Sequence, residues 1–216
     1  MSDYPPTERT TVHRKPNRAV YDQAAIHAIL DEAFVCQIGF ALDGQPYVIP
    51  TNYVRVEKRL FLHGSTASRM FRALAAGAPL CLSVTLIDGL VLAPTVNGHS
   101  MNYRSVVVLG KTQPIEDPQE KFAAMRSFFE RMFPGRWASV RPPSELEMKA
   151  TMVLAVPLNE LSAKVRSGPP VDDEAEYARE VWTGVLPLKL TPGAPQPDPR
   201  GKASLPMPDY VRNYSR

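Results

Sequence analysis

The feature that most constrains this chain is a series of strand-like segments with few helices between them. FVCQIGFAL and YVIPTNYVRV flank Asp43-Gly44, a dipeptide typical of a tight hairpin turn. RLFLHG, PLCLSVTLIDGLVLAP and MNYRSVVVLGKTQPIE follow them, and MVLAVPL and SAKVRSG supply one or two late strands. This order predicts a mainly β, α+β protein built on an antiparallel barrel, and not a doubly wound parallel sheet.

Three segments have the period of an amphipathic helix. The first begins at about Asp22, whose side chain can cap it; the second follows HGSTASRM and stops at Gly77; the third runs from Pro118 to Phe133. The residues predicted to face the core are Ile26, Ile29, Leu30 and Ala33 in the first helix, Met70, Phe71, Leu74 and Ala75 in the second, and Phe122, Met125, Phe128, Phe129 and Met132 in the third.

The composition is that of one globular domain with polar ends. The chain has 216 residues, 44% hydrophobic and 22% charged, which is enough for a substantial core. We predict a domain over residues 21–189, preceded by a polar arm at 1–20. Residues 190–216 are rich in proline and poor in core-forming residues, so we expect a disordered tail.

Charge and hydropathy exclude several classes of protein. The net charge is only +3 and the basic residues are dispersed, which argues against a nucleic-acid partner. No apolar run approaches the ~20 residues that cross a bilayer, which argues against a membrane protein. The polar start lacks the apolar stretch of a secretory signal, so the expected location is the cytoplasm.

The cysteines and histidines predict no metal site. Cys36 and Cys81 each lie in an apolar stretch without metal-ligand spacing, which favours two reduced core thiols over a disulfide or a zinc site. The four histidines do not form an H-x-x-x-H or H-E-x-x-H pair.

HGSTASRM places an arginine, Arg69, in the first turn of a predicted helix. A helix N-terminus is already positive because its first N–H groups are unpaired and the helix dipole adds to them. Ser65, Thr66 and Ser68 offer hydroxyl groups, and Gly64 lets the backbone approach a ligand closely. The segment therefore predicts a phosphate site; a capped surface helix whose arginine points into water is the alternative.

Chemistry could also occur at two neighbouring places. His63 ends a strand directly before the predicted phosphate site, where its imidazole would face a docked ligand; a structural strand histidine is the alternative. In HSMNYRSVVV, the residues Tyr103, Arg104 and Ser105 precede a valine run. They predict a hydrogen-bonding and stacking wall, or else an ordinary exposed strand end.

Six segments match one known family in consistent order: RAVYDQAAIHAILDEA, DGQPYVIPTNYVR, RLFLHGSTASRM, SVTLIDGLVLA, HSMNYRSVV and PGRWASVRPPSELEMKAT. The chain resembles the pyridoxamine 5'-phosphate oxidase-related, flavin-nucleotide-binding family, in the branch similar to nitroimidazole-resistance proteins, over roughly residues 9–188. The resemblance implies a split β-barrel of antiparallel strands with flanking helices. It also implies a homodimer with two FMN molecules at the subunit interface.

The resemblance also implies roles for particular residues. Ser68 and Arg69 match the pair that grips the FMN phosphate, and His63 matches a histidine near the flavin that would deliver a proton to the substrate. Residues 50–53 match the strand along the flavin ring, and Ser105 matches a polar contact to it. The residues predicted to bind the cofactor are Pro50, Thr51, Asn52, Tyr53, Leu62, His63, Gly64, Ser65, Ser68, Arg69, Tyr103, Arg104 and Ser105.

The resemblance favours an FMN-dependent oxidoreductase that reduces small electron-poor substrates such as nitroaromatics, with NAD(P)H as the electron donor. Pro94 and Asn97-Gly98 depart from the family pattern on the substrate side. The alternatives are a flavin- or haem-binding barrel used for storage or sensing, and a dimeric barrel without a cofactor. Trp182 is expected to anchor the core, with a cover over a flavin as its alternative.

Overall fold

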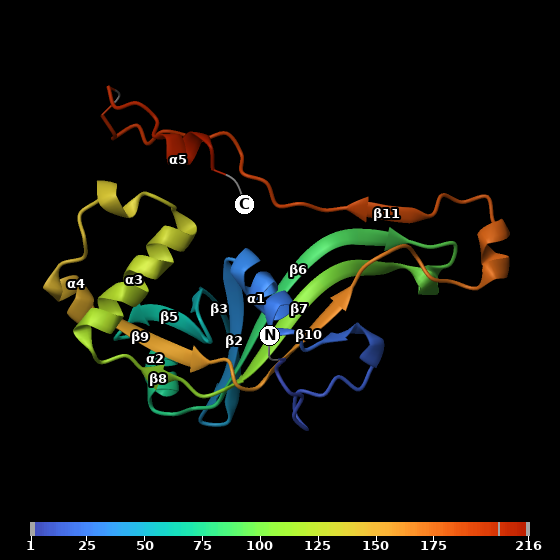
Figure 1. Cartoon of the computed structure of the whole chain (residues 1–216), viewed down its shortest axis with the longest axis horizontal. Helices are drawn as coiled ribbons and strands as arrows, with labels where there is room; N and C mark the ends of the chain where they lie inside the picture. The colour runs from blue at the N-terminus through green and yellow to red at the C-terminus, as the bar shows by residue number, and fades with distance from the viewer. Residues whose placement is uncertain (1–2, 203, 215–216) are drawn as a thin grey trace.

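The computed structural model describes residues 3–202 and 204–214. Residues 1–2 of the predicted arm and residues 203, 215 and 216 of the predicted tail lie outside the described part. The described strands form two antiparallel sheets that are not joined into one closed cylinder (Figure 1). This architecture confirms the predicted antiparallel α+β split barrel.

The larger sheet has seven strands and the smaller has four. The order in the larger sheet is β1 (Ala19–Val20), β10 (Leu161–Arg166), β7 (Ser100–Gly110), β6 (Leu80–Leu92), β2 (Val35–Leu42) and β3 (Gln45–Asn52), with β11 (Gly184–Pro187) also paired to β6. The order in the smaller sheet is β4 (Val54–Val56), β5 (Arg59–Ser65), β9 (Thr151–Pro157) and β8 (Gln113–Pro114).

The helices flank these sheets. They are α1 (Gln23–Glu32), α2 (Arg69–Ala75), α3 (Pro118–Met132), α4 (Glu145–Ala150) and α5 (Asp209–Arg212), with 3-10 helices at Pro16–Arg18, Val96–Gly98, Trp137–Ser139 and Glu174–Ala178. The three helices expected from the sequence are α1, α2 and α3. None of the helices in the described ranges is both long enough and apolar enough to cross a membrane.

Local sequence signals set the boundaries of these elements as predicted. Asp43 and Gly44 have positive φ angles of 52° and 78°, which the hairpin turn between β2 and β3 requires. The Asp22 carboxylate accepts a hydrogen bond from the Ala25 amide at 2.7 Å and caps α1. Gly77, with φ of 93°, lies just beyond the end of α2.

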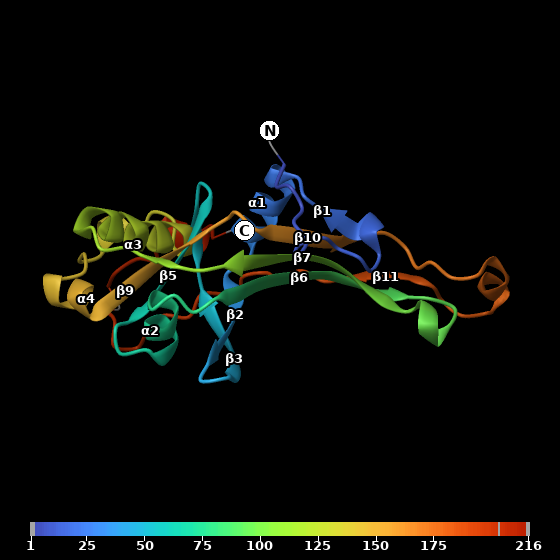
Figure 2. The same cartoon turned by 90° about the horizontal axis from the view of Figure 1, so that it is seen from below.

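Beyond the barrel, β6 and β7 continue as a long hairpin, with β11 beside β6 (Figures 1 and 2). At its tip, the Asp172 carboxylate accepts hydrogen bonds from the hydroxyl and amide of Thr95. Trp182 lies on the chain between this tip and β11 and is 68% exposed, so the prediction that it anchors the core is wrong. It leaves the core because β11 pairs with the distal part of the hairpin, away from the barrel.

Two predictions about buried side chains are also wrong. Cys36 is buried as expected, but Cys81 is exposed, because β6 alternates and its neighbours Leu80 and Leu82 take the inward positions. In α3, Phe122 is 37% exposed and packs edge-on against Trp137, with ring centroids 5.5 Å apart. The buried positions of α3 are Ala124 and Phe128, which pack on the outer face of the smaller sheet.

Arg131 connects α3 to α1. Its guanidinium donates hydrogen bonds to the carbonyl oxygens of Leu30 and Ala33, at 2.8 and 2.7 Å, and forms an ion pair with Asp31. These contacts satisfy carbonyl groups at the C-terminus of α1, where a cation is favourable. They fix α3 beside the strands that carry Asn52 and His63.

Candidate functional site

The predicted phosphate site lies where β5 passes into α2. The Ser68 hydroxyl oxygen accepts a hydrogen bond from the Phe71 amide at 3.4 Å and caps α2, and the Ser65 hydroxyl oxygen accepts from the Ala67 amide at 3.1 Å. A hydroxyl that accepts a bond still has its own hydrogen to donate. Both serines can therefore hold the turn and donate to an anion.

Gly64 is required by packing at this junction. A Cβ built on Gly64 would lie 2.5 Å from the ring of Phe71, which is buried in the main core. The ring of Phe71 thus occupies the space that a side chain would need, and any larger residue would displace it. This packing brings the first turn of α2 close to the end of β5.

The charge of Arg69 is not neutralised by a carboxylate. Its guanidinium lies 4.5 Å from the centroid of the Tyr47 ring, and Tyr47 stacks on Phe40 in the β2–β3 hairpin. Within residues 3–202 and 204–214, Arg69 forms no ion pair. An exposed cation held beside two serine hydroxyls is suited to bind a phosphate.

His63 and Asn52 share a small cleft of about 150 Å³ with aromatic and methionine side chains of α3. The His63 ring packs edge-on against Phe128, and its Nδ1 atom is buried without a hydrogen-bond partner among the described residues. Burial lowers the pKa of His63 below its ordinary value of 6.5, because it disfavours the charged imidazolium. The imidazole is therefore neutral near pH 7, the form that binds metals or accepts a proton.

Two residues that were predicted to face the flavin have side chains buried in the core. Tyr53 is 1% exposed, and its hydroxyl donates to the Leu30 carbonyl at 2.6 Å. Leu62 is fully buried in the main cluster. Their side chains stabilise the barrel, so a ligand beside β3 or β5 could meet only their backbone groups.

The β7 residues lie apart from this cleft. Arg104 donates to the carboxylates of Glu32 and Asp88, and these bonds raise its pKa above the ordinary value, with Glu32 as the larger cause. The Ser105 hydroxyl donates to the Lys164 carbonyl at 3.2 Å. Arg104 lines a different pocket from His63, next to Lys189 and Thr191.

The fold of one chain thus brings together two groups of predicted residues. Asn52 and His63 form one group, and Ser65, Ser68 and Arg69 form the other. Tyr103, Arg104 and Ser105 lie on β7, apart from both groups. Sequence reasoning did not assign to the site the side chains that wall the cleft, among them Met132 of α3 and Phe133, the residue after it. Their apolar character is visible in the sequence, but the same stripe equally describes a helix buried in the core. In the described part of the chain, no cluster of three or more His, Cys, Asp or Glu side chains could hold a metal ion.

Comparison with known proteins assigns the family. Residues 22–165, two thirds of the chain, match the family model of pyridoxamine 5'-phosphate oxidase. The chain belongs to the pyridoxamine 5'-phosphate oxidase family. No protein with a curated description matches it.

Three solved structures are similar to this chain. The flavocytochrome Anf3 from Azotobacter vinelandii is 40% identical, with 96% of this chain and 97% of that chain covered and a TM-score of 0.91. A FAD- and haem-binding protein from Mycobacterium smegmatis is 33% identical, with 91% and 96% covered and a TM-score of 0.87. A candidate 5-nitroimidazole antibiotic resistance protein from Bacteroides thetaiotaomicron is 26% identical, with 68% and 86% covered and a TM-score of 0.58.

Proposed function

We propose that this protein is a redox protein that binds both a flavin and a haem. The observation that carries the proposal is the near-full-length similarity to a flavocytochrome and to a FAD- and haem-binding protein, at 40% and 33% identity. A flavocytochrome is a protein that holds a flavin and a haem. The local geometry supports each cofactor separately.

The flavin phosphate would bind at the junction of β5 and α2. The hydroxyl groups of Ser65 and Ser68 and the unneutralised guanidinium of Arg69 provide donors for it. FMN is the flavin that the family resemblance implies, whereas FAD is the flavin named for the Mycobacterium smegmatis protein. We take FAD first, because that similarity covers 91% of this chain.

The residue that fits a haem iron is His63. Imidazole is a common axial ligand of haem, and the buried Nδ1 atom of His63 makes no hydrogen bond with any described residue. Burial keeps this imidazole neutral, as a ligand must be. When bound, a flavin supplies hydride and electron chemistry and a haem supplies one-electron chemistry, and the protein orients them and excludes water.

We further propose a homodimer. Tyr103, Arg104 and Ser105 lie on β7, away from the cleft that contains His63. Two copies that associate across the larger sheet could bring Tyr103 of one copy to a cofactor held by the other. Sedimentation or light scattering on the purified protein tests this, and a monomer loaded with both cofactors would refute it.

A second candidate function is the reduction of small electron-poor substrates such as nitroaromatics, with NAD(P)H as the electron donor. It is favoured by the similarity to the Bacteroides thetaiotaomicron protein and by the neutral His63 beside Asn52. In this case His63 would exchange a proton with the substrate. Flavin-loaded protein should then be bleached by NADPH and recover with a nitroaromatic; a flavin that NADPH leaves oxidised rejects this candidate.

The experiment that tests the leading proposal is an absorbance spectrum of the full-length protein. The protein is incubated with FAD, FMN or hemin, passed through a desalting column and measured, and the retained flavin is identified after release. We expect flavin bands and a Soret band whose intensities correspond to near-equimolar flavin and haem. A protein that is colourless after desalting would refute the proposal. Retention of flavin alone would refute haem binding, and retention of haem alone would refute flavin binding.

A further inference from the structure

One face of the long β6–β7 hairpin is apolar and exposed. We define the distal part of this hairpin, residues 89–101, together with β11 as the hairpin extension (Figures 1 and 2). Within it, Leu186 of β11 is opposite Leu90 of β6, and Leu90 is opposite Met101 of β7. Opposed residues of antiparallel strands point to the same face, so these three side chains form one row. They are 53%, 40% and 47% exposed, respectively.

Trp182 extends this row. A Cβ built on Gly184 would lie 2.7 Å from the Trp182 ring, so the indole lies over Gly184. Gly184 and Leu186 are two residues apart on β11 and point to the same side. Trp182, Leu186, Leu90 and Met101 therefore form one contiguous group, which we call the extension patch. Single exposed apolar side chains are common on proteins, whereas a contiguous patch indicates an interaction surface.

The opposite face of the hairpin extension is covered by the chain itself. Val91 and Ala93 point to that face and are buried. The segment that follows β10 packs there, because the Asn102 side-chain amide donates a hydrogen bond to the Gly168 carbonyl at 3.1 Å. The fold thus buries one face of the extension and leaves the extension patch on the other.

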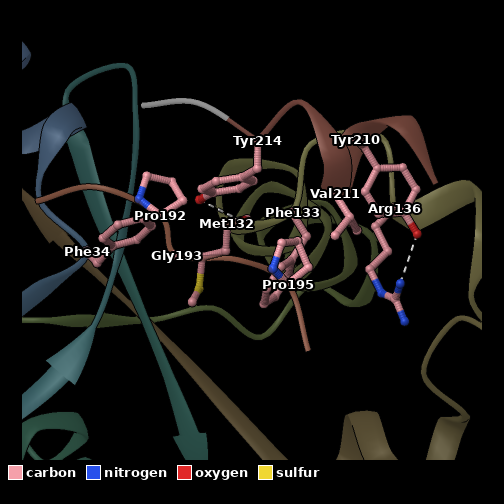
Figure 3. Close-up of a pocket in the computed structure, with 10 residues that line it drawn as sticks. All are labelled: Phe34, Met132, Phe133, Arg136, Pro192, Gly193, Pro195, Tyr210, Val211 and Tyr214. Carbon is pink, nitrogen blue, oxygen red and sulfur yellow. Dashed lines mark hydrogen bonds between the residues drawn. The ribbon is translucent and has the colours of Figure 1, made fainter. Parts of the chain in front are cut away.

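The C-terminal segment, residues 192–214, does not cover the extension patch. It packs on the end of α3, around a cavity of about 520 Å³ (Figure 3). The Arg136 guanidinium donates a hydrogen bond to the Tyr210 hydroxyl at 2.8 Å, and the Tyr214 hydroxyl donates to the Met132 carbonyl at 3.2 Å (Figure 3). Since α3 lies at the opposite end of the molecule from the extension (Figure 1), these contacts hold the segment away from the patch.

The extension patch continues into the outer face of the larger sheet. Met101 and Tyr103 are two residues apart on β7 and point to the same side, and Tyr103 is opposite the exposed Ile87 of β6. The bulge in β6 after Ile87 turns Asp88 toward Arg104, on the other side of the sheet. The patch and Tyr103 therefore belong to one continuous face.

This continuous face has the size and the composition of a dimer interface. β6 has 13 residues, so the face is about 43 Å long at about 3.3 Å per residue. With three or four neighbouring strands about 4.8 Å apart, its area is on the order of 600–800 Å². A stable dimer buries about 800 Å² on each partner. The positions of β6 and β7 that point to this face carry no charged side chain, as is typical of the centre of an interface.

We propose that the extension patch is covered by a second copy of this chain and forms part of the dimer interface. This inference rests on the homodimer proposed above and names a surface that forms it. The extension projects past the barrel of its own copy (Figures 1 and 2), so a partner that lies on the larger sheet also meets the patch. Two-fold symmetry buries the same patch on both copies. The family model ends at residue 165, so Trp182 and Leu186 add to the part of the chain that it matches.

The test is sedimentation velocity of the full-length protein over a dilution series. Leu90→Glu and Leu186→Glu each place a charge in the extension patch, and we expect the dissociation constant of the dimer to rise by about tenfold or more. The matched control is Leu146→Glu on α4, which is exposed at the end of the molecule away from the extension (Figure 1) and should leave the dissociation constant unchanged. Circular dichroism verifies that each variant is folded.

A second measurement uses Trp182, one of the two tryptophans in the chain. In a Trp137→Phe background, we expect acrylamide to quench Trp182 fluorescence several-fold more strongly in the dilute monomer than in the dimer. Equal quenching in both states would overturn the burial of the patch.

The outcomes separate this inference from the proposals on which it rests. A wild-type dimer whose dissociation constant is unchanged in both Leu90→Glu and Leu186→Glu would overturn the role of the extension and leave the homodimer standing. A wild type that is monomeric at every concentration would overturn both. The absorbance of bound flavin and haem in the same samples tests the cofactor proposal independently of the oligomeric state.

Discussion

The imidazole of His63 meets the ring of Phe128 edge-on, with centroids 4.3 Å apart and ring planes at 67°. Phe128 belongs to α3, and Arg131 holds α3 against the C-terminus of α1. The environment of His63 is therefore set by a helix whose contacting residue, Phe128, lies 65 positions further along the chain. This environment is apolar, which explains both the buried Nδ1 atom and the lowered pKa of His63.

The pKa of His63 predicts a pH dependence of stability. Because the folded-state pKa lies below the ordinary 6.5, the folded protein binds fewer protons than the unfolded chain as the pH falls through this range. The free energy of unfolding of the apoprotein should therefore decrease below about pH 6.5, and it should decrease less in His63→Leu. Urea unfolding at pH 8 and pH 5.5 measures this difference.

The control for this effect is His13→Leu, since His13 is exposed. Burial also lowers the pKa of His27, which hydrogen bonds to Tyr4, so the wild type and both variants share that contribution. If the free energy of unfolding fell by the same amount between pH 8 and pH 5.5 in His63→Leu and in the wild type, this result would contradict the burial of a neutral His63.

Gly64→Ala should destabilise the fold by about 1–3 kcal/mol, because the new methyl group would overlap the Phe71 ring. The midpoint of urea unfolding measures the loss, and adding Phe71→Leu should recover part of it. Gly110→Ala is the matched control at another strand position, where an added Cβ meets no atom within 4 Å. Similar midpoints for Gly64→Ala and Gly110→Ala would contradict the close packing at the junction of β5 and α2.

Arg69→Ala should weaken flavin binding by about tenfold or more, since it removes a charge-assisted hydrogen bond to the phosphate. Its effect on stability should stay below about 1 kcal/mol, because Arg69 is exposed and its guanidinium contacts only the face of the partly buried Tyr47 ring. Arg72→Ala, on the exposed side of the same helix, is the control for general charge. Fluorescence titration with FAD and FMN measures the affinity of each variant. Equal affinities in Arg69→Ala and Arg72→Ala would show that Arg69 does not bind the flavin phosphate.

Arg104→Met separates the two roles available to Arg104. Its guanidinium is already bound by Glu32 and Asp88, so the substitution should lower stability by about 1 kcal/mol, less in 1 M salt, and leave flavin affinity within about twofold. Arg141→Met breaks a fully exposed pair with Glu147 and should cost less. Loss of flavin from Arg104→Met at unchanged stability would restore Arg104 to the cofactor site.

Local features of this protein were predictable from the sequence. The Asp43-Gly44 turn and the caps provided by Asp22 and Ser68 follow from interactions within a few residues. The burial of Cys81 and Phe122 was predicted wrongly, because an apolar neighbourhood in the sequence does not say which face of a strand or helix meets the core.

The site itself was decided by the tertiary structure. The Arg104 guanidinium donates a hydrogen bond to Glu32, which lies 72 residues earlier in the chain. The Tyr214 hydroxyl donates to the carbonyl of Met132, which lies 82 residues earlier. Whether an arginine is free for an anion, and which side chains surround His63, depends on how distant segments pack. The sequence alone predicted most of the strands, the helices α1 to α3 and the family. Packing between those elements decided that Asn52 and His63 share one cleft while Arg104 lies in another pocket. The physical reason is that secondary structure follows from short-range periodicity, whereas a site requires contacts whose geometry no local pattern encodes.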